Sequence, residues 1–166
     1  MHTFDASAAP RNWDLYLAAV VDIRFEDRVV HVEPRSPGVA EGPFPGPAQG
    51  ATVHVITAWN PLGRTASFAA NARAHRLLLA EVRSLGPTWW PAEGRDKQGM
   101  HREESVAVVG LDDAAALGLG RRFGQDAIFA WTPDAWRLLT CDGGVTAARG
   151  WAAFETRNRS TAASRH

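Results

Sequence analysis

The residues best suited to chemistry are amides, carboxylates and arginines in four short segments of the chain. Asn60 follows an apolar run, so its side chain either presents an amide to a cleft or caps the turn that ends a strand. Asn71 lies inside a helical pattern, where asparagine has low propensity, which indicates a structural or functional hydrogen bond. Gln125 and Arg122 lie near the end of a second helical pattern. Side chains of these types predict a site that forms hydrogen bonds or binds an anion.

Glu103 and Glu104 are neighbours, so on a strand their side chains face opposite sides and one of them can face a cleft. The inward glutamate either forms an ion pair with Arg121 or Arg122 or serves as a general acid or base. The second role needs burial or a like charge to bring the pKa toward neutrality. Arg122, at a helix C-terminus, either balances the helix dipole or helps to clamp an anion.

Trp59 and His101 are the remaining candidates for a ligand site. Trp59, with Trp89 and Trp90, could line a cleft that stacks a flat ligand, whereas the other tryptophans are expected in the core. His101 lies beside the glutamates, but the chain has no second histidine near it, no HExxH motif and no cysteine cluster, so no metal site is predicted. GxSxG, Walker A and GxGxxG motifs are also missing, so no cofactor is expected.

Length and composition indicate one globular domain. The 166 residues are 45% apolar, and we place the domain at residues 13–153, with residues 1–12 and 155–166 as loosely ordered tails. Eighteen basic and eighteen acidic residues give zero net charge, which disfavours nucleic acid as a partner. The chain has no long apolar run and no signal-peptide pattern, and its one cysteine, Cys141, suits a reducing compartment. We therefore expect a cytoplasmic protein that does not enter membranes.

The hydrophobic pattern predicts a hairpin of two strands, then strand, helix, strand, strand, helix and strand, and a final strand. This order predicts an α+β fold with a ferredoxin-like βαββαβ core over residues 52–131. Its sheet would be mostly antiparallel, with the two main helices on one face and the hairpin added to the sheet. The predicted ranges are 21–25 and 30–34 for the hairpin, 52–59, 65–85, 88–90, 105–111, 112–123 and 127–131 for the core, and 136–141 for the last strand.

This topology makes strands 52–59 and 105–111 antiparallel neighbours. The end of the first strand and the start of the second then lie at the same edge of the sheet. We expect a polar cleft there, with most side-chain distances within roughly 12 Å. The residues expected at this edge are Asn60, Asn71, Glu103 or Glu104, Arg122 and Gln125.

The same segments resemble domain-of-unknown-function family 3293. The resemblance covers roughly residues 15–141 and rests on Ile56-Thr57-Ala58-Trp59-Asn60-Pro61, Asn71-Ala72-Arg73, Glu103-Glu104-Ser105 and residues 121–128. Family members tend to read Glu-Pro-Ser where this chain has Glu103-Glu104-Ser105, so Glu103 is the better match to the family's glutamate. The resemblance implies motif positions and no activity.

Three hypotheses for function follow from these residues. The first is a binding or regulatory module that holds a small anionic or planar ligand, such as a nucleotide, in the cleft. The second is a hydrolase or transferase that uses Glu103 or Glu104 as acid or base, with Arg122 and Gln125 as electrostatic stabilisers. The third is a structural polar lock that joins the four segments, in a protein whose function lies in a protein interface.

Overall fold

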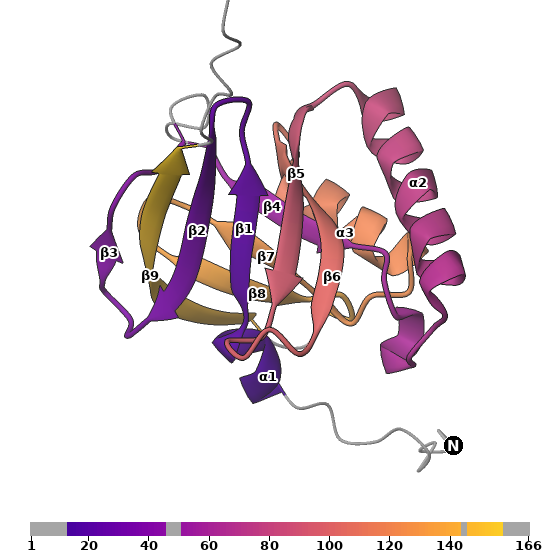
Figure 1. Ribbon diagram of the computed structural model, residues 1–166, viewed down its shortest axis with the longest axis horizontal. Coiled ribbons are helices and arrows are strands. Elements are labelled where there is room, and N and C mark those ends of the chain that lie inside the picture. Colours follow the sequence, from indigo (N-terminus) through magenta and orange to yellow (C-terminus); the bar gives the residue numbers. More distant parts are fainter. Residues whose placement is uncertain (1–12, 46–50, 144–145, 158–166) are drawn as a thin grey trace, which may run out of the picture.

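The computed structural model describes residues 13–45, 51–143 and 146–157 (Figure 1). The predicted tail at residues 1–12, and residues 158–166 of the other tail, lie outside the described residues. The elements in chain order are helix α1 (Trp13–Ala18), strands β1 (Val20–Arg24), β2 (Arg28–Arg35), β3 (Ala40–Glu41) and β4 (Val53–Thr57), the 3₁₀ turn η2 (Pro61–Gly63), helix α2 (Phe68–Leu85), strands β5 (Thr88–Arg95) and β6 (Arg102–Val109), helix α3 (Asp113–Arg122), and strands β7 (Ala127–Trp131), β8 (Trp136–Thr140) and β9 (Thr146–Arg157).

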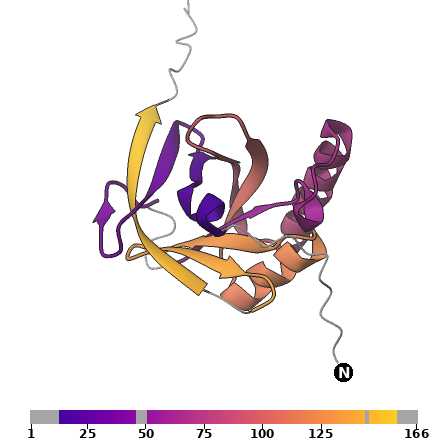
Figure 2. The same cartoon turned by 90° about the horizontal axis from the view of Figure 1, so that it is seen from below.

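Eight of the nine described strands form a closed antiparallel barrel. Their order is β2-β1-β5-β6-β4-β7-β8-β9, and β9 pairs with β2 to close the ring. The two-residue strand β3 pairs in parallel with β9 on the outside. Figure 2 shows the ring of strands from one end of the barrel.

The predicted ferredoxin-like α+β fold is therefore wrong. Strands β4 and β6 are antiparallel neighbours, with Thr57 opposite Ser105, as the prediction required. The prediction also extended the sheet with the hairpin and with strand 136–141, and β1–β2 and β8 do extend it on the two sides. However, β9 then joins the two ends, so the sheet is closed and not open. A closed barrel has no unpaired edge strand, so no further strand can be added to the sheet.

Strand β9 is the barrel strand that the sequence pattern did not predict. It continues to Arg157, beyond the predicted domain end at residue 153, and its register with β2 runs from Arg28–Arg157 to Arg35–Gly150. Gly150 permits this close packing, because a Cβ there would lie 2.2 Å from the Ser36 carbonyl oxygen and 2.4 Å from that of Val39. Only glycine can occupy that position without moving the backbone.

The barrel wall separates two apolar layers. On β4, Val55 points into the barrel and Ile56 points out toward the helices, as expected from strand alternation. Leu78 of α2 and Leu119 of α3 pack in the outer layer. The two longer helices thus cover the outside of a barrel and not one face of an open sheet.

The two ends of the barrel interior differ. Near the start of β4, Trp131 contacts Trp136 and Trp151, with ring centroids 6.2 and 5.1 Å apart. Near the end of β4 the short helix α1 lies across the opening (Figures 1 and 2), and none of its residues is buried. Among the described residues, no helix is long and apolar enough to span a membrane.

Candidate functional site

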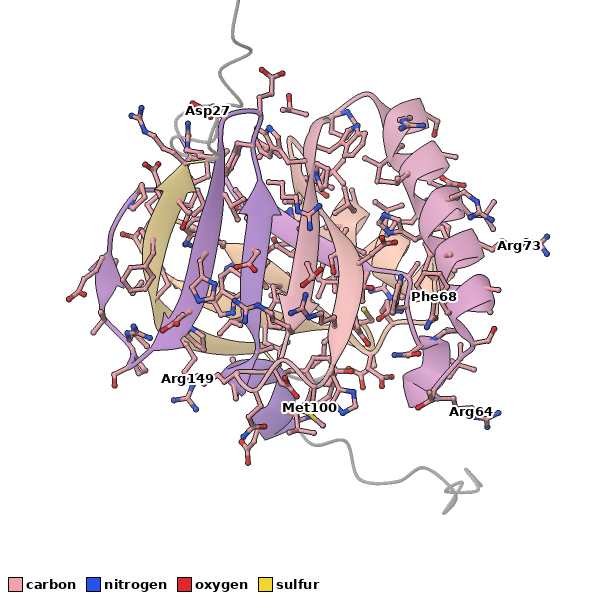
Figure 3. The ribbon with its side chains drawn as sticks, viewed as in Figure 1. Asp27, Arg64, Phe68, Arg73, Met100 and Arg149 are labelled. Atoms are coloured by element: carbon pink, nitrogen blue, oxygen red, sulfur yellow. The ribbon has the colours of Figure 1, made fainter. Side chains whose placement is uncertain are left out.

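A cavity of about 440 Å³ occupies the end of the barrel beneath α1. It lies where β4 ends and β6 begins, and its wall is formed by inward-facing residues of five strands. The turn between β5 and β6, marked by the exposed Met100 in Figure 3, lies at the same end. The apolar part of the lining includes Leu15, Tyr16, Val21, Val55, Trp59 and Phe129, and the polar part includes Thr57, Asn60, Arg95, His101, Glu103, Ser105 and Gln125.

Asn60 organises the polar wall. It adopts the left-handed conformation, with φ 49°, in the short segment between β4 and η2, immediately before η2. Asparagine tolerates this conformation better than most residues, which explains its place at the end of the strand. Its side-chain Oδ1 accepts a hydrogen bond from the Ala66 backbone N–H at 3.0 Å, while its Nδ2 donates to Glu103 Oε1 at 3.1 Å.

Asn71 holds Asn60 in this conformation from the first turns of α2. The Asn60 backbone N–H donates to Asn71 Oδ1 at 2.8 Å, and Asn71 Nδ2 donates to Asn60 Oδ1 at 3.0 Å. Asn71 is only 3% exposed and does not line the cavity. Its hydrogen bonds therefore explain why a weak helix former lies inside α2. Asn71 therefore supports the loop after β4 and does not face the cavity.

Glu103 faces the cavity. In the register of β5 and β6 it lies opposite Gly94, which also lines the cavity. Burial raises the pKa of the Glu103 carboxyl above its usual value of 4.5, and the hydrogen bond from Asn60 and the charge of His101 offset this only in part. A carboxyl in this state accepts strong hydrogen bonds and keeps its proton to a higher pH than an exposed glutamate does.

Glu104 and Arg122 lie away from the cavity. Because neighbouring strand residues face opposite sides, Glu104 points outward, where its Oε2 lies 3.8 Å from His75 Nε2. Arg122 is exposed and its Nη1 donates to Glu81 Oε2 of α2 at 2.9 Å. The predicted pairing of Arg122 with the inward glutamate is therefore wrong, since α3 packs Leu119 inward and directs Arg122 toward α2.

Gln125, Trp59 and His101 all line the cavity. Gln125 Nε2 donates to the backbone oxygens of Trp59 at 3.0 Å and Phe123 at 3.2 Å, so it joins the end of β4 to the segment after α3. The Trp59 ring lies perpendicular to the Phe68 ring, 6.1 Å between centroids. His101 is exposed at the rim.

Two other predicted aromatic residues do not contribute to the site. Trp89 packs outside the barrel, with Arg83 over its ring, and Trp90 contacts Phe25 in the interior. The described residues contain no group of three or more histidine, cysteine or carboxylate side chains placed to hold a metal ion.

Several lining residues were not singled out from sequence. Leu15 and Tyr16 come from α1, a six-residue helix too short for a clear periodic signal. Thr57 and Ser105 are small polar residues in inward positions of strands, where alternation with Val55 and Ala107 could have placed them. Their contribution depends on the barrel being closed, which the sequence analysis did not predict.

The fold and the cavity together define a small closed antiparallel barrel with a ligand-sized cavity in one mouth, a common position for binding sites in this architecture. The model of the family described as "Protein of unknown function (DUF3293)" matches residues 56–128 and confirms the resemblance over that segment. The matched residues include Asn60, Asn71, Glu103 and Gln125. No curated protein and no solved structure matches the chain.

Proposed function

We propose that this protein is a binding module that holds a small, planar and largely apolar molecule in the barrel-mouth cavity. The observation that carries the proposal is a cavity of about 440 Å³ that combines aromatic walls with a desolvated carboxyl. The volume falls within the range of roughly 300–1,000 Å³ that is typical of small-molecule sites. Trp59, Tyr16 and Phe129 offer flat apolar surfaces for such a molecule.

The alternative of a purely structural polar lock accounts for part of the network. The Asn71 side chain accepts from the Asn60 backbone N–H and donates to Asn60 Oδ1, as a lock requires. Glu103 differs. In the described part of the chain its side chain accepts one hydrogen bond, from Asn60, and forms no ion pair. Partly burying a carboxyl with so few partners weakens the fold, which favours a role for Glu103 toward a ligand.

The hydrolase or transferase alternative has less support. It needs Arg122 beside the carboxyl, and Arg122 pairs with Glu81 on the outside instead. The nearest hydroxyl candidate, Ser105 Oγ, donates to the Glu103 backbone oxygen at 3.2 Å and has no general base among its described hydrogen-bond partners. Glu103 could act as a general acid, but Arg122, the stabiliser that this hypothesis assigns beside it, does not line the cavity.

The proposal is tested by filling the cavity without disturbing the fold. A Cβ built on Gly94 meets only Ser105 Oγ, at 3.9 Å, so Gly94→Leu extends into the cavity from β5. Gly118→Leu is the matched control, because a Cβ at Gly118 on α3 meets nothing within 4 Å. A thermal-shift screen of planar metabolites, nucleotides and aromatic fragments should give ligands that stabilise the wild type and Gly118→Leu.

The same ligands should no longer stabilise Gly94→Leu, although this variant keeps the wild-type circular dichroism spectrum. If none of the compounds stabilises the wild type, or if Gly94→Leu responds as the wild type does, the barrel mouth is not the binding site.

A further inference from the structure

The polar groups on the inner wall of the cavity have used most of their hydrogen-bond donors within the protein. Gln125 Nε2 donates to two backbone oxygens, those of Trp59 and Phe123. Thr57 Oγ1 donates to the Glu104 backbone oxygen at 2.8 Å, and Ser105 Oγ donates to the Glu103 backbone oxygen. Hydrogen bonds that join neighbouring strands and loops have therefore taken the donors that would otherwise face a ligand.

Acceptors remain on the same wall. Asn60 occupies Oε1 of Glu103, and among the described residues no donor is within hydrogen-bond distance of Oε2. Gln125 Oε1 likewise accepts no hydrogen bond in the described part of the chain. Thr57 Oγ1 also accepts from the Trp59 backbone N–H at 3.1 Å, and the oxygens of Thr57 and Ser105 each keep one lone pair or more after these bonds. The inner wall is thus rich in acceptors and centred on a carboxyl.

The cations near the cavity do not change this balance. Arg95 lies at the rim, where its Nε donates to Asp22 Oδ2 at 3.3 Å and its guanidinium contacts His31 on the outer face of the barrel. His101 also lines the cavity, from the turn before β6, where it is exposed and where its charge lowers the pKa of Glu103 by less than burial raises it. The Trp59 indole N–H is a neutral donor that is buried without a partner in the described residues. One neutral N–H does not balance an anion held beside a carboxylate.

We propose that the ligand presents N–H donors to Glu103 and Gln125, as an amidine, guanidine or amino-substituted aromatic ring does, and that anionic ligands are rejected. This inference rests on the proposed function and narrows it. An amidine or aminoheterocycle is planar, carries two N–H groups on one edge, and pairs with a carboxylate in the two-point geometry that gives strong charge-assisted hydrogen bonds. Its ring then lies against the aromatic residues of the wall.

Three probes that differ in the polar head test this inference: naphthalene-2-carboxamidine, naphthalene-2-carboxamide and naphthalene-2-carboxylate. Their shared bicyclic ring makes the apolar contact the same, while the head changes from cation to neutral amide to anion. Dissociation constants are measured by calorimetry or by protein-observed NMR for the wild type, Glu103→Gln and Glu104→Gln. Glu104→Gln is the matched control, because it changes the neighbouring residue on the outer face.

The amidine should bind the wild type and Glu104→Gln about ten-fold or more tightly than the carboxylate. In Glu103→Gln this preference should disappear, because amidine affinity falls by a similar factor while the amide binds as before. Unchanged amide binding also shows that the variant keeps an intact cavity. The inference alone is overturned if the carboxylate binds the wild type as tightly as the amidine, or if Glu103→Gln keeps the preference. If none of the three probes binds at millimolar concentration, the proposed function fails with it.

Discussion

Replacing Asn71 with alanine should destabilise the protein while leaving the walls of the cavity in place. The substitution removes the acceptor for the Asn60 backbone N–H at 2.8 Å and the donor to Asn60 Oδ1 at 3.0 Å. Each hydrogen bond contributes about 0.5–1.5 kcal/mol, and a buried N–H without a partner costs about 1–3 kcal/mol. Alanine recovers up to about 0.7 kcal/mol of helix propensity. We expect a net loss of about 2 kcal/mol in the free energy of unfolding.

Urea denaturation followed by tryptophan fluorescence measures this change, and thermal unfolding should show the midpoint lowered by about 4–8 °C for a domain of this size. The control is Arg73→Ala, two residues along the same helix, because Arg73 is exposed on the outside of α2 (Figure 3) and its loss should change the unfolding free energy by less than about 0.5 kcal/mol. If Asn71→Ala behaves like Arg73→Ala, Asn71 does not hold the loop after β4 and the argument for the polar wall fails.

Three further predictions concern Glu103, His54 and Leu62. Glu103→Gln should make the protein more stable at pH 7. Ionising the partly buried carboxyl costs stability as pH rises from 4.5 through its raised pKa, and this cost is absent in the variant. The urea curves of the two proteins should therefore converge near pH 4. His54 is fully buried, and burial lowers its pKa below 6.5 despite its hydrogen bond to Asp113. The free energy of unfolding should therefore fall as pH drops below 6.5. Denaturation at pH 7.5 and 5.5 should show a smaller fall in this free energy for His54→Gln than for the wild type. Leu62 has φ 60°, in the left-handed region that asparagine tolerates better than leucine, and it is 70% exposed. Leu62→Asn should therefore raise the unfolding free energy by about 0.5–1 kcal/mol in thermal denaturation. An unchanged or lower midpoint would show that the leucine side chain is needed at this position.

Local pattern was sufficient to predict most elements but not the closure of the barrel. The strand containing Val55 and the strand containing Ala107 were placed as antiparallel neighbours, and they pair in that way. Strand β9 has alanine at positions 147, 148, 152 and 153 and so lacks the β-branched run that marks a strand. Its pairing with β2 joins residues more than a hundred positions apart, and hydrophobic periodicity contains no information about such a partner.

The candidate site was predictable to the extent that it depended on strand ends. Asn60, Asn71, Glu103 and Gln125 come together by direct hydrogen bonds or by lining one cavity, because β4 and β6 are antiparallel. The choice between Glu103 and Glu104 required the direction of the barrel interior, which only the closed sheet defines. Arg122 was misplaced because its position at a helix C-terminus does not specify which side of the helix it occupies.

The most direct test of the account is an NMR titration of the Glu103 side-chain carboxyl carbon, identified by its loss in Glu103→Gln, with and without naphthalene-2-carboxamidine. In the free protein the pKa should lie above its usual value of 4.5, because burial in the barrel mouth disfavours the charged form. With the amidine bound, the pKa should fall, since a cation beside the carboxyl favours its ionised form. A pKa at the ordinary value in the free protein, or one that the amidine leaves unchanged, would contradict the assignment of Glu103 as the ligand-facing group of this cavity.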